Sequence, residues 1–252
     1  MKKMFLFLMS FIACFAEDVL STSEINQIFE QFVEVNYTQE YASRYDKIPF
    51  GKLKNPDYWI GKDFPRLIAI LEFDRFIKEQ HLSFKKTLSF YSADPEFDYF
   101  ITDEVYEFKY TDDVVNHDLH TLNIAGEDYD FVMLNQTLEH LYNPLLCLKN
   151  VYKKLRSGGI LYINVPACNV PHMTPIHFST GFTPMGLATT IKMAGFELMQ
   201  VGQWGSVPYT IKMFSSKPWP KDIPWPDYKA LKGNGHNDLH CPVITWAFAR
   251  KP

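Results

Sequence analysis

Carboxylate and amide side chains fall where the sequence predicts the ends of buried strands: Asp94, Asp112, Asp118, Asn135 and Gln136. The carboxyl ends of parallel strands meet at one edge of a sheet, so we expect these side chains to surround one polar ligand there. A carboxylate about twenty residues after the first loop can hold the two hydroxyls of a ribose, and Asp112 has this spacing.

Histidines are the candidates for acid–base chemistry. His140 lies near the start of a predicted helix, whereas His172 and His177 lie on the loop after the next strand. Imidazole titrates near neutral pH, so His140 or His172 could accept a proton from an oxygen or nitrogen nucleophile. The alternative is that these rings bond only to the backbone. Likewise, Glu139 could line the pocket or only solvate a helix start.

No metal site is predicted from the sequence. None of the four cysteines belongs to a C-x-x-C pair, so a zinc site built on thiolates is not expected. His236 and His240 flank an Asn-Asp pair, but no third ligand is evident beside them.

Short apolar runs alternate with helical periodicity from residue 86 onward, which is typical of βαβ units. The pattern predicts an α/β fold of the Rossmann-like, doubly wound class, a mostly parallel sheet with an antiparallel edge strand and N-terminal helices. Strands are predicted at 87–91, 105–110, 114–119, 130–135, 160–165, 196–201 and 242–250, and helices at 24–35, 64–80, 95–101, 137–155 and 183–194, the 137–155 helix ending in a C-cap at 157–159.

Three segments are expected along the chain. Residues 1–16 combine two lysines, a short apolar run and small residues, which indicates a signal peptide or signal-anchor. Residues 17–85 form an N-terminal helical and lid segment, with the lid at 37–61, and residues 86–252 form the α/β domain. The apolar run is shorter than the roughly 20 residues of a membrane span, so no stable span is expected after cleavage.

The expected location follows from that N-terminus. A genuine signal places the protein outside the cell, in a periplasm or in an endomembrane lumen, whereas a buried N-terminal segment leaves it in the cytoplasm. The net charge of −4 and the lack of a Lys/Arg run argue against nucleic acid as a partner. The oligomeric state is left open.

Four motifs follow one another within residues 118–205: Y-D-F-V-M-L-N at 129–135, T-L-E-H-L-Y-N-P at 137–144, L-R-S-G-G-I-L at 155–161, and H-F through T with A-G-F-E between 177 and 197. In this order and spacing they resemble the type 11 family of class I S-adenosylmethionine-dependent methyltransferases. The resemblance implies S-adenosylmethionine as cofactor and a small-molecule, lipid or sugar-like methyl acceptor. It places Asp118 and Leu119 beside the adenine, and Asn135 and Gln136 beside the methionine part.

The first loop departs from the family pattern. Residues 89–96 contain no glycine, although the family has a glycine-rich turn that lets the backbone approach the cofactor. We expect Ser92 and Ala93 to be small enough for this approach and Asp94 to bind the cofactor's ammonium group, while Tyr91 borders or fills the cofactor's space.

Two alternatives to a methyltransferase stay open. A methyltransferase-like fold without its cofactor loop could serve as a non-catalytic binding protein, and the signal-like N-terminus favours this because S-adenosylmethionine is made in the cytosol. A dinucleotide or nucleotide-sugar enzyme is less favoured, because the chain has neither a G-x-G-x-x-G fingerprint nor a Tyr-x-x-x-Lys element.

Overall fold

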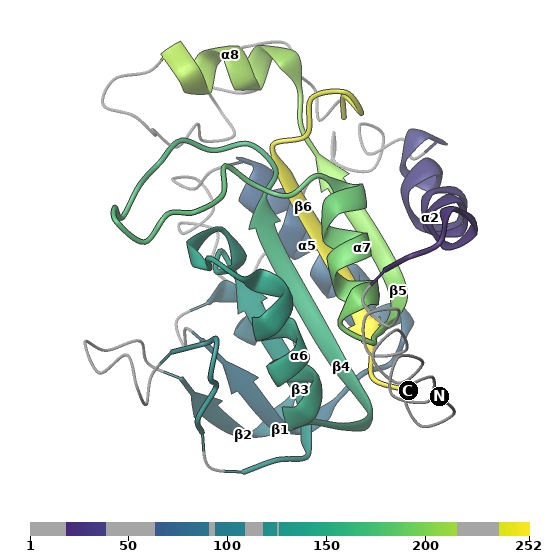
Figure 1. Cartoon of the computed structure of the whole chain (residues 1–252), viewed down its shortest axis with the longest axis vertical. Helices are drawn as coiled ribbons and strands as arrows, with labels where there is room; N and C mark the ends of the chain where they lie inside the picture. Colours follow the sequence, from purple (N-terminus) through teal and green to yellow (C-terminus); the bar gives the residue numbers. More distant parts are fainter. Residues whose placement is uncertain (1–18, 39–63, 91–93, 109–117, 125, 216–236) are drawn as a thin grey trace, which may run out of the picture.

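Six strands form one sheet in the order β2-β1-β3-β4-β6-β5 (Figure 1). The computed structural model describes residues 19–38, 64–90, 94–108, 118–124, 126–215 and 237–252. The strands are β1 Phe84–Ser89, β2 Thr102–Glu107, β3 Tyr129–Asn135, β4 Leu155–Pro166, β5 Glu197–Trp204 and β6 Ile244–Arg250.

The first four strands across the sheet are parallel, and β6 runs antiparallel to both of its neighbours, β4 and β5. The pair β5–β6 therefore forms an antiparallel edge. The predicted class, a mostly parallel doubly wound sheet with antiparallel pairing at one edge, is confirmed.

Helices cover both faces of the sheet (Figure 1). One apolar core joins the sheet to α2 (Thr22–Ile28), the π-helical η1 (Phe29–Val33), α6 (Pro144–Lys154) and α7 (Pro184–Met193). The other joins it to α5 (Phe64–Glu79), the 3-10 helix η4 (Pro95–Tyr99) and α8 (Val207–Ser215). Two short 3-10 helices complete the elements, η2 (Glu34–Thr38) and η5 (Leu138–His140).

Strand β3 shows how the sequence separates these two cores. Val132 and Leu134 belong to the first core, whereas Phe131 and Met133 belong to the second. Successive side chains of a strand point to opposite faces, so a continuous apolar run is what a strand covered on both faces requires. The predicted strand at 130–135 is confirmed for this reason.

The helix predicted at 137–155 is wrong in its first turns. Residues 138–140 form η5, and α6 begins only at Pro144, after Asn143 accepts a hydrogen bond from the backbone N–H of Leu146 at 3.1 Å. Asn143 is thus an N-cap inside the stretch predicted as one helix, with a proline directly after it. Residues 137–143 therefore lie outside α6 and connect the end of β3 to this helix.

The C-cap predicted at 157–159 is also wrong, because α6 ends at Lys154 and β4 begins at Leu155. Gly159 lies within β4, where a Cβ would lie 3.0 Å from the carbonyl oxygen of Tyr129 on the neighbouring strand β3. The glycine therefore permits close strand contact rather than ending a helix.

The remaining differences concern element boundaries. Strands β1 and β2 each begin three residues before their predicted starts. A strand predicted at 114–119 is not confirmed, since residues 118 and 119 lie at a turn and 114–117 lie outside the described residues. Helix α8 was not predicted. The expected signal segment lies outside the described residues, and so does the expected lid, apart from residues 37 and 38 at the end of η2.

The caps expected for α7 are confirmed. Thr183 Oγ1 accepts from the backbone N–H of Gly186 at 3.2 Å, and Pro184 occupies the first turn. None of the helices described is long and apolar enough to cross a bilayer.

Candidate functional site

A group of polar side chains, here named the strand-end network, lies at the carboxyl ends of β1, β3 and β4. Its members come from α5, from the segment after β1, from the end of β3 and from β4: Arg66, Asp94, Glu96, Asn135, Gln136 and Asn164. This is the edge at which parallel sheets bind their ligands.

Arg66 is the centre of the network. Its guanidinium donates to Asn164 Oδ1 at 2.8 Å and forms ion pairs with Glu96 at 2.7 Å and Asp94 at 3.4 Å. Asn135 Nδ2 donates to Asp94 Oδ2 at 2.9 Å. A cation from α5 thus joins two acids of the first loop region to the ends of β3 and β4.

Burial controls the charge of the two acids. It raises the pKa of Glu96 to about 7, and it raises the pKa of Asp94 although Arg66 and Asn135 act in the opposite direction. One guanidinium therefore faces two carboxyl groups, of which Glu96 is only partly ionised at neutral pH. The network carries a formal charge between −1 and zero.

Three polar atoms of the network are buried without a hydrogen-bond partner among the described residues. Glu96 Oε1 still has its ion pair with Arg66, whereas the acceptor Asn135 Oδ1 and the donor Asn164 Nδ2 have no charged partner. Each such atom costs free energy unless a ligand or water completes its bonding. The next residue, Gln136, has a positive φ of 48°, and a non-glycine residue in this region is often found at functional sites. These features indicate a site built for a polar ligand.

Three members of the network, Arg66, Glu96 and Asn164, were not predicted. The one available signal was an arginine inside the apolar stretch of α5, because a buried arginine requires a partner.

The predicted adenine ligands lie in a turn after residue 117. Asp118 Oδ1 accepts hydrogen bonds from the backbone N–H of His120 at 2.8 Å and from its ring Nδ1 at 2.7 Å. Leu119 is half-buried against the first core. The carboxylate of Asp118 is thus held in place by its own turn, with 28% of its side chain exposed.

The other predicted cofactor ligands, Tyr91, Ser92, Ala93 and Asp112, lie outside the described residues. Because β2 ends at Glu107, the half-buried carboxylate directly at that strand end is Glu107. This residue was not among the predicted ligands.

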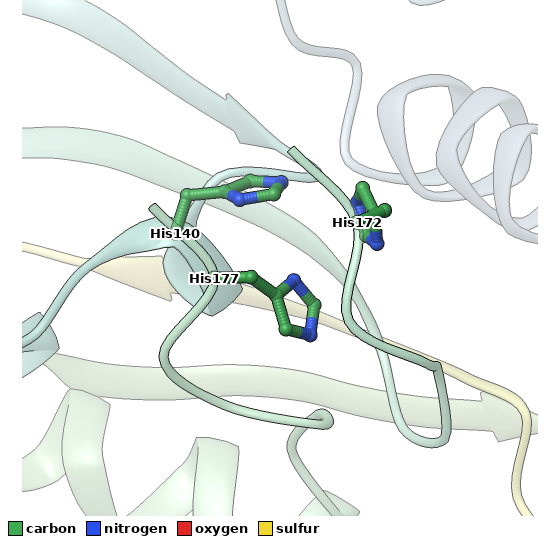
Figure 2. A group of neighbouring side chains, drawn as sticks. All are labelled: His140, His172 and His177. Atoms are coloured by element: carbon green, nitrogen blue, oxygen red, sulfur yellow. The ribbon is translucent and has the colours of Figure 1, made fainter. Parts of the chain in front are cut away.

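A second group, here named the histidine cluster, consists of His140, His172 and His177. Figure 2 shows His140 on η5 and the other two on the loop after β4, with the three rings turned toward one another. Ring centroids are 4.8 Å apart for His140 and His172, 5.4 Å for His140 and His177, and 4.6 Å for His172 and His177. The structure brings together both predicted base candidates and adds His177.

Hydrogen bonds orient two of these rings. Nδ1 of His140 lies 2.8 Å from the carbonyl oxygen of Ile176, and Nδ1 of His172 lies 3.0 Å from that of Val170. A carbonyl only accepts, so each Nδ1 carries the proton and each Nε2 keeps a free lone pair. Burial lowers the pKa of His140, which favours the neutral ring that a proton acceptor needs.

Glu139 lies beside the cluster. Its carboxyl group is 1% exposed, its Oε1 is 3.9 Å from His140 Nε2, and neither oxygen has a hydrogen-bond partner among the described residues. Burial raises its pKa to about 7. The backbone carbonyl of Glu139 accepts from the N–H groups of Phe178 and Ser179 at 2.9 and 3.2 Å, which fastens the loop to η5.

A depression of about 860 Å³ lies at the amino ends of β1 to β4, whereas the strand-end network lies at their carboxyl ends. Its charged lining includes Lys85, Lys86, Asp130 and Arg156. Parallel sheets bind ligands at the other edge, and Asp130 is already paired with Arg156 at 2.6 Å. The strand-end network and the histidine cluster are therefore the candidate functional site.

One protein-family model matches part of the chain. Residues 93–163 match the model of the type 11 methyltransferase family, described as a methyltransferase domain. This segment contains Asp94, Asp118, Asn135 and Gln136. No curated protein matches the chain in sequence.

Solved structures similar to the chain include two methyltransferases. One is an S-adenosylmethionine-dependent methyltransferase from Archaeoglobus fulgidus, with 14% identity, a TM-score of 0.45, and coverage of 74% of this chain and 94% of that one. The other is the N-methyltransferase NodS from Bradyrhizobium japonicum WM9 in complex with S-adenosylhomocysteine, with 12% identity, a TM-score of 0.44, and coverage of 89% and 98%. Identities this low carry no inference about substrate.

Proposed function

We propose that this chain, which belongs through residues 93–163 to the type 11 methyltransferase family, transfers the methyl group of S-adenosylmethionine to a small-molecule, lipid or sugar-like acceptor. The observation that carries the proposal is the strand-end network, because its groups complement an amino acid. When bound, the cofactor supplies an activated methyl group on a sulfonium, and the chain's residues bind and orient the reactants.

The methionine part of the cofactor carries an ammonium and a carboxylate. Asp94 supplies a carboxylate for the first, and Arg66 supplies a guanidinium for the second. Asn135 Oδ1 and Asn164 Nδ2 add an unpaired acceptor and donor. The network's charge of −1 to zero also suits a ligand whose sulfonium gives it a net positive charge.

The nucleoside part is assigned to the neighbouring strand ends. Asp118 and Leu119 border the adenine in this proposal, and the ribose hydroxyls bind Asp112 or Glu107, the carboxylate at the end of β2. Tyr91, Ser92 and Ala93 are further proposed contacts of the cofactor. These assignments stay proposals.

The acceptor is expected at the histidine cluster. His140 and His172 each keep a free Nε2 lone pair, so either can take the proton that an oxygen or nitrogen acceptor releases. Glu139 has a pKa of about 7 and is a third candidate for this role. Most of the rate enhancement would come from orientation in a site sheltered from water.

Calorimetric titration of the full chain with S-adenosylmethionine and S-adenosylhomocysteine tests the proposal. We expect micromolar binding of both. Asp94→Asn keeps a similar shape and removes one charge, and a lost charged hydrogen bond of about 1.5–3 kcal/mol corresponds to a Kd roughly 10- to 150-fold higher. Asp103→Asn is the matched control, since Asp103 is exposed on β2.

The outcomes separate the two functional hypotheses. A folded chain that binds neither compound at millimolar concentration would overturn the proposal and favour a non-catalytic binding protein. Binding that Asp94→Asn and Asp103→Asn leave equally unchanged would remove the strand-end network from the cofactor site.

A further inference from the structure

We propose that the histidine cluster binds a divalent transition-metal ion, with zinc as the expected metal. The three side chains come from two segments, His140 from η5 and His172 and His177 from the loop after β4. One ring nitrogen from each lies within 4.8 Å of the other two. A three-nitrogen site at the functional edge of the sheet adds a metal to the proposed function.

The distances are close to those of a metal site. Zinc binds histidine nitrogens at about 2.0–2.1 Å in tetrahedral geometry, which separates two ligand nitrogens by about 3.3 Å. The nitrogens here lie at most 4.8 Å apart, so binding requires them to approach by no more than about 1.5 Å. Side-chain rotation of His172 and His177 on their loop can supply this movement.

The outer hydrogen bonds match those of metal-bound histidines. A ligating imidazole typically donates its other N–H to a backbone carbonyl or carboxylate, which sets its tautomer and orientation. His140 does so to Ile176 O and His172 to Val170 O. In both rings the remaining nitrogen is Nε2, with its lone pair available to a metal.

The environment of His177 supports a bound metal independently of the distances. Both of its ring nitrogens are shielded from solvent and lack a hydrogen-bond partner among the described residues. A shielded polar atom without a partner costs free energy, and simple packing of three rings would leave this cost in place. A bound cation satisfies one nitrogen of each ring at once.

The ligand set favours zinc over calcium or magnesium. Imidazole suits zinc, copper, iron and nickel, whereas calcium and magnesium require oxygen ligands. Three protein ligands leave a fourth position open, as in catalytic zinc sites. The carboxyl group of Glu139, 3.9 Å from His140 Nε2, lies next to the cluster.

The open position suggests a role that rests on the proposed methyl transfer. An acceptor hydroxyl bound to the metal there would lose its proton more readily. The proton would pass to solvent, and the oxygen lone pair would form the bond to the methyl carbon while the carbon–sulfur electrons pass to sulfur. The histidines would then position the acceptor rather than act as bases.

The test is metal binding to the full, untagged chain in the absence of any methyl donor. After treatment with a chelator, the chain is titrated with zinc chloride, and in parallel with cobalt chloride. We expect one equivalent of zinc to bind with a Kd of 1 µM or lower, on the order of 8 kcal/mol. Cobalt should give visible absorption of a tetrahedral site without thiolate-to-metal charge transfer.

Two variants and a control locate the site. His177→Gln and His172→Gln should each raise the zinc Kd at least tenfold with an unchanged circular dichroism spectrum. His81→Asn is the control, because His81 is exposed and has a positive φ that asparagine tolerates. It should bind zinc as the original chain does.

Several results would overturn the metal site: no zinc bound at one equivalent, thiolate charge transfer that assigns the metal to cysteines, or unchanged affinity in both glutamine variants. The test also stands apart from the proposed function. A chain that binds S-adenosylmethionine but not zinc loses only the metal site, and a chain that binds zinc alone loses only the methyl transfer.

Discussion

Replacing Arg66 with methionine removes the cation that joins α5 to the strand ends. The side chain of Arg66 is 16% exposed, and those of its partners Glu96 and Asp94 are 0% and 10% exposed. Methionine occupies similar space, so the main effect is electrostatic. Breaking a buried ion pair by removing one partner costs about 3–5 kcal/mol, because a charge stays buried without compensation. We expect a loss of this size in the free energy of unfolding at pH 8.

The loss should depend on pH. Burial already raises the pKa of Glu96 from its ordinary 4.5 to about 7 with Arg66 present, and removing the guanidinium raises it further. Between these values the folded chain holds a proton that the unfolded chain releases, so stability falls as pH rises from 4.5 through 7. In the original chain this difference of 2.5 pKa units corresponds to about 3 kcal/mol of stability lost between pH 4.5 and pH 7. The higher pKa of Glu96 in Arg66→Met extends the loss above pH 7, so the deficit of the variant should be larger at pH 8 than at pH 5.

Urea unfolding followed by circular dichroism at pH 5 and pH 8 measures both effects. The double variant Arg66→Met with Glu96→Gln removes the cation together with one of its acids, and it should recover most of the stability lost at pH 8. The reasoning is refuted if Arg66→Met loses less than about 1 kcal/mol at pH 8, or if its loss is the same at both pH values. Either result would mean that water reaches these carboxylates.

Two further substitutions examine the cofactor site and the core. Asp118→Asn keeps an acceptor for the backbone N–H of His120 but removes the charge, so the Kd for S-adenosylmethionine should rise about tenfold or more by calorimetry; an unchanged Kd would exclude Asp118 as a ligand. Gly202→Ala places a Cβ 2.3 Å from the buried Trp246 indole and should destabilise the chain by about 1–3 kcal/mol or more in urea. Gly186→Ala in α7 is the control, because its Cβ would lie 3.3 Å from Thr183 Oγ1, and it should change stability by no more than about 1 kcal/mol. Equal losses in the two alanine variants would contradict the overpacking argument.

The sheet could be predicted from the sequence where burial on both faces produced an apolar run. The run at 130–135 corresponds to β3, and the run at 160–165 forms the second half of β4. Strand β1 was placed too late because its first half is polar. Lys85 and Lys86 lie in the strand, and their backbone N–H groups donate to the carboxylate of Asp130 at 3.1 and 2.8 Å. A side-chain acceptor on a neighbouring strand leaves no periodic signal.

The residues of the candidate site could be predicted only where they lie close in sequence to a recognisable strand. Asn135 ends β3, and Gln136 and His140 lie within the next five residues, so the apolar run of the strand located them. Arg66 could not be found in this way, since it reaches Asp94 from 28 positions away in the chain and α5 carries no site motif. His177 was noted as a loop histidine, but its contact with His140 depends on the backbone bonds between residues 139 and 178.

The backbone hydrogen bonds from Phe178 and Ser179 to Glu139 also connect the strand-end network with the histidine cluster. Strands β3 and β4 are parallel neighbours, and their carboxyl ends are joined by Gln136, whose backbone N–H donates to Asn164 O at 2.7 Å and whose amide donates to Asn164 Oδ1 at 2.7 Å. From this junction η5 carries His140 outward, and the loop after β4 returns to the carbonyl of Glu139. A ligand that repositions Asn164 or Gln136 therefore acts on the residue pair that supports both the strand-end network and the histidine cluster. We expect the methyl donor and the metal to affect each other's affinity, since coupling between two sites is reciprocal.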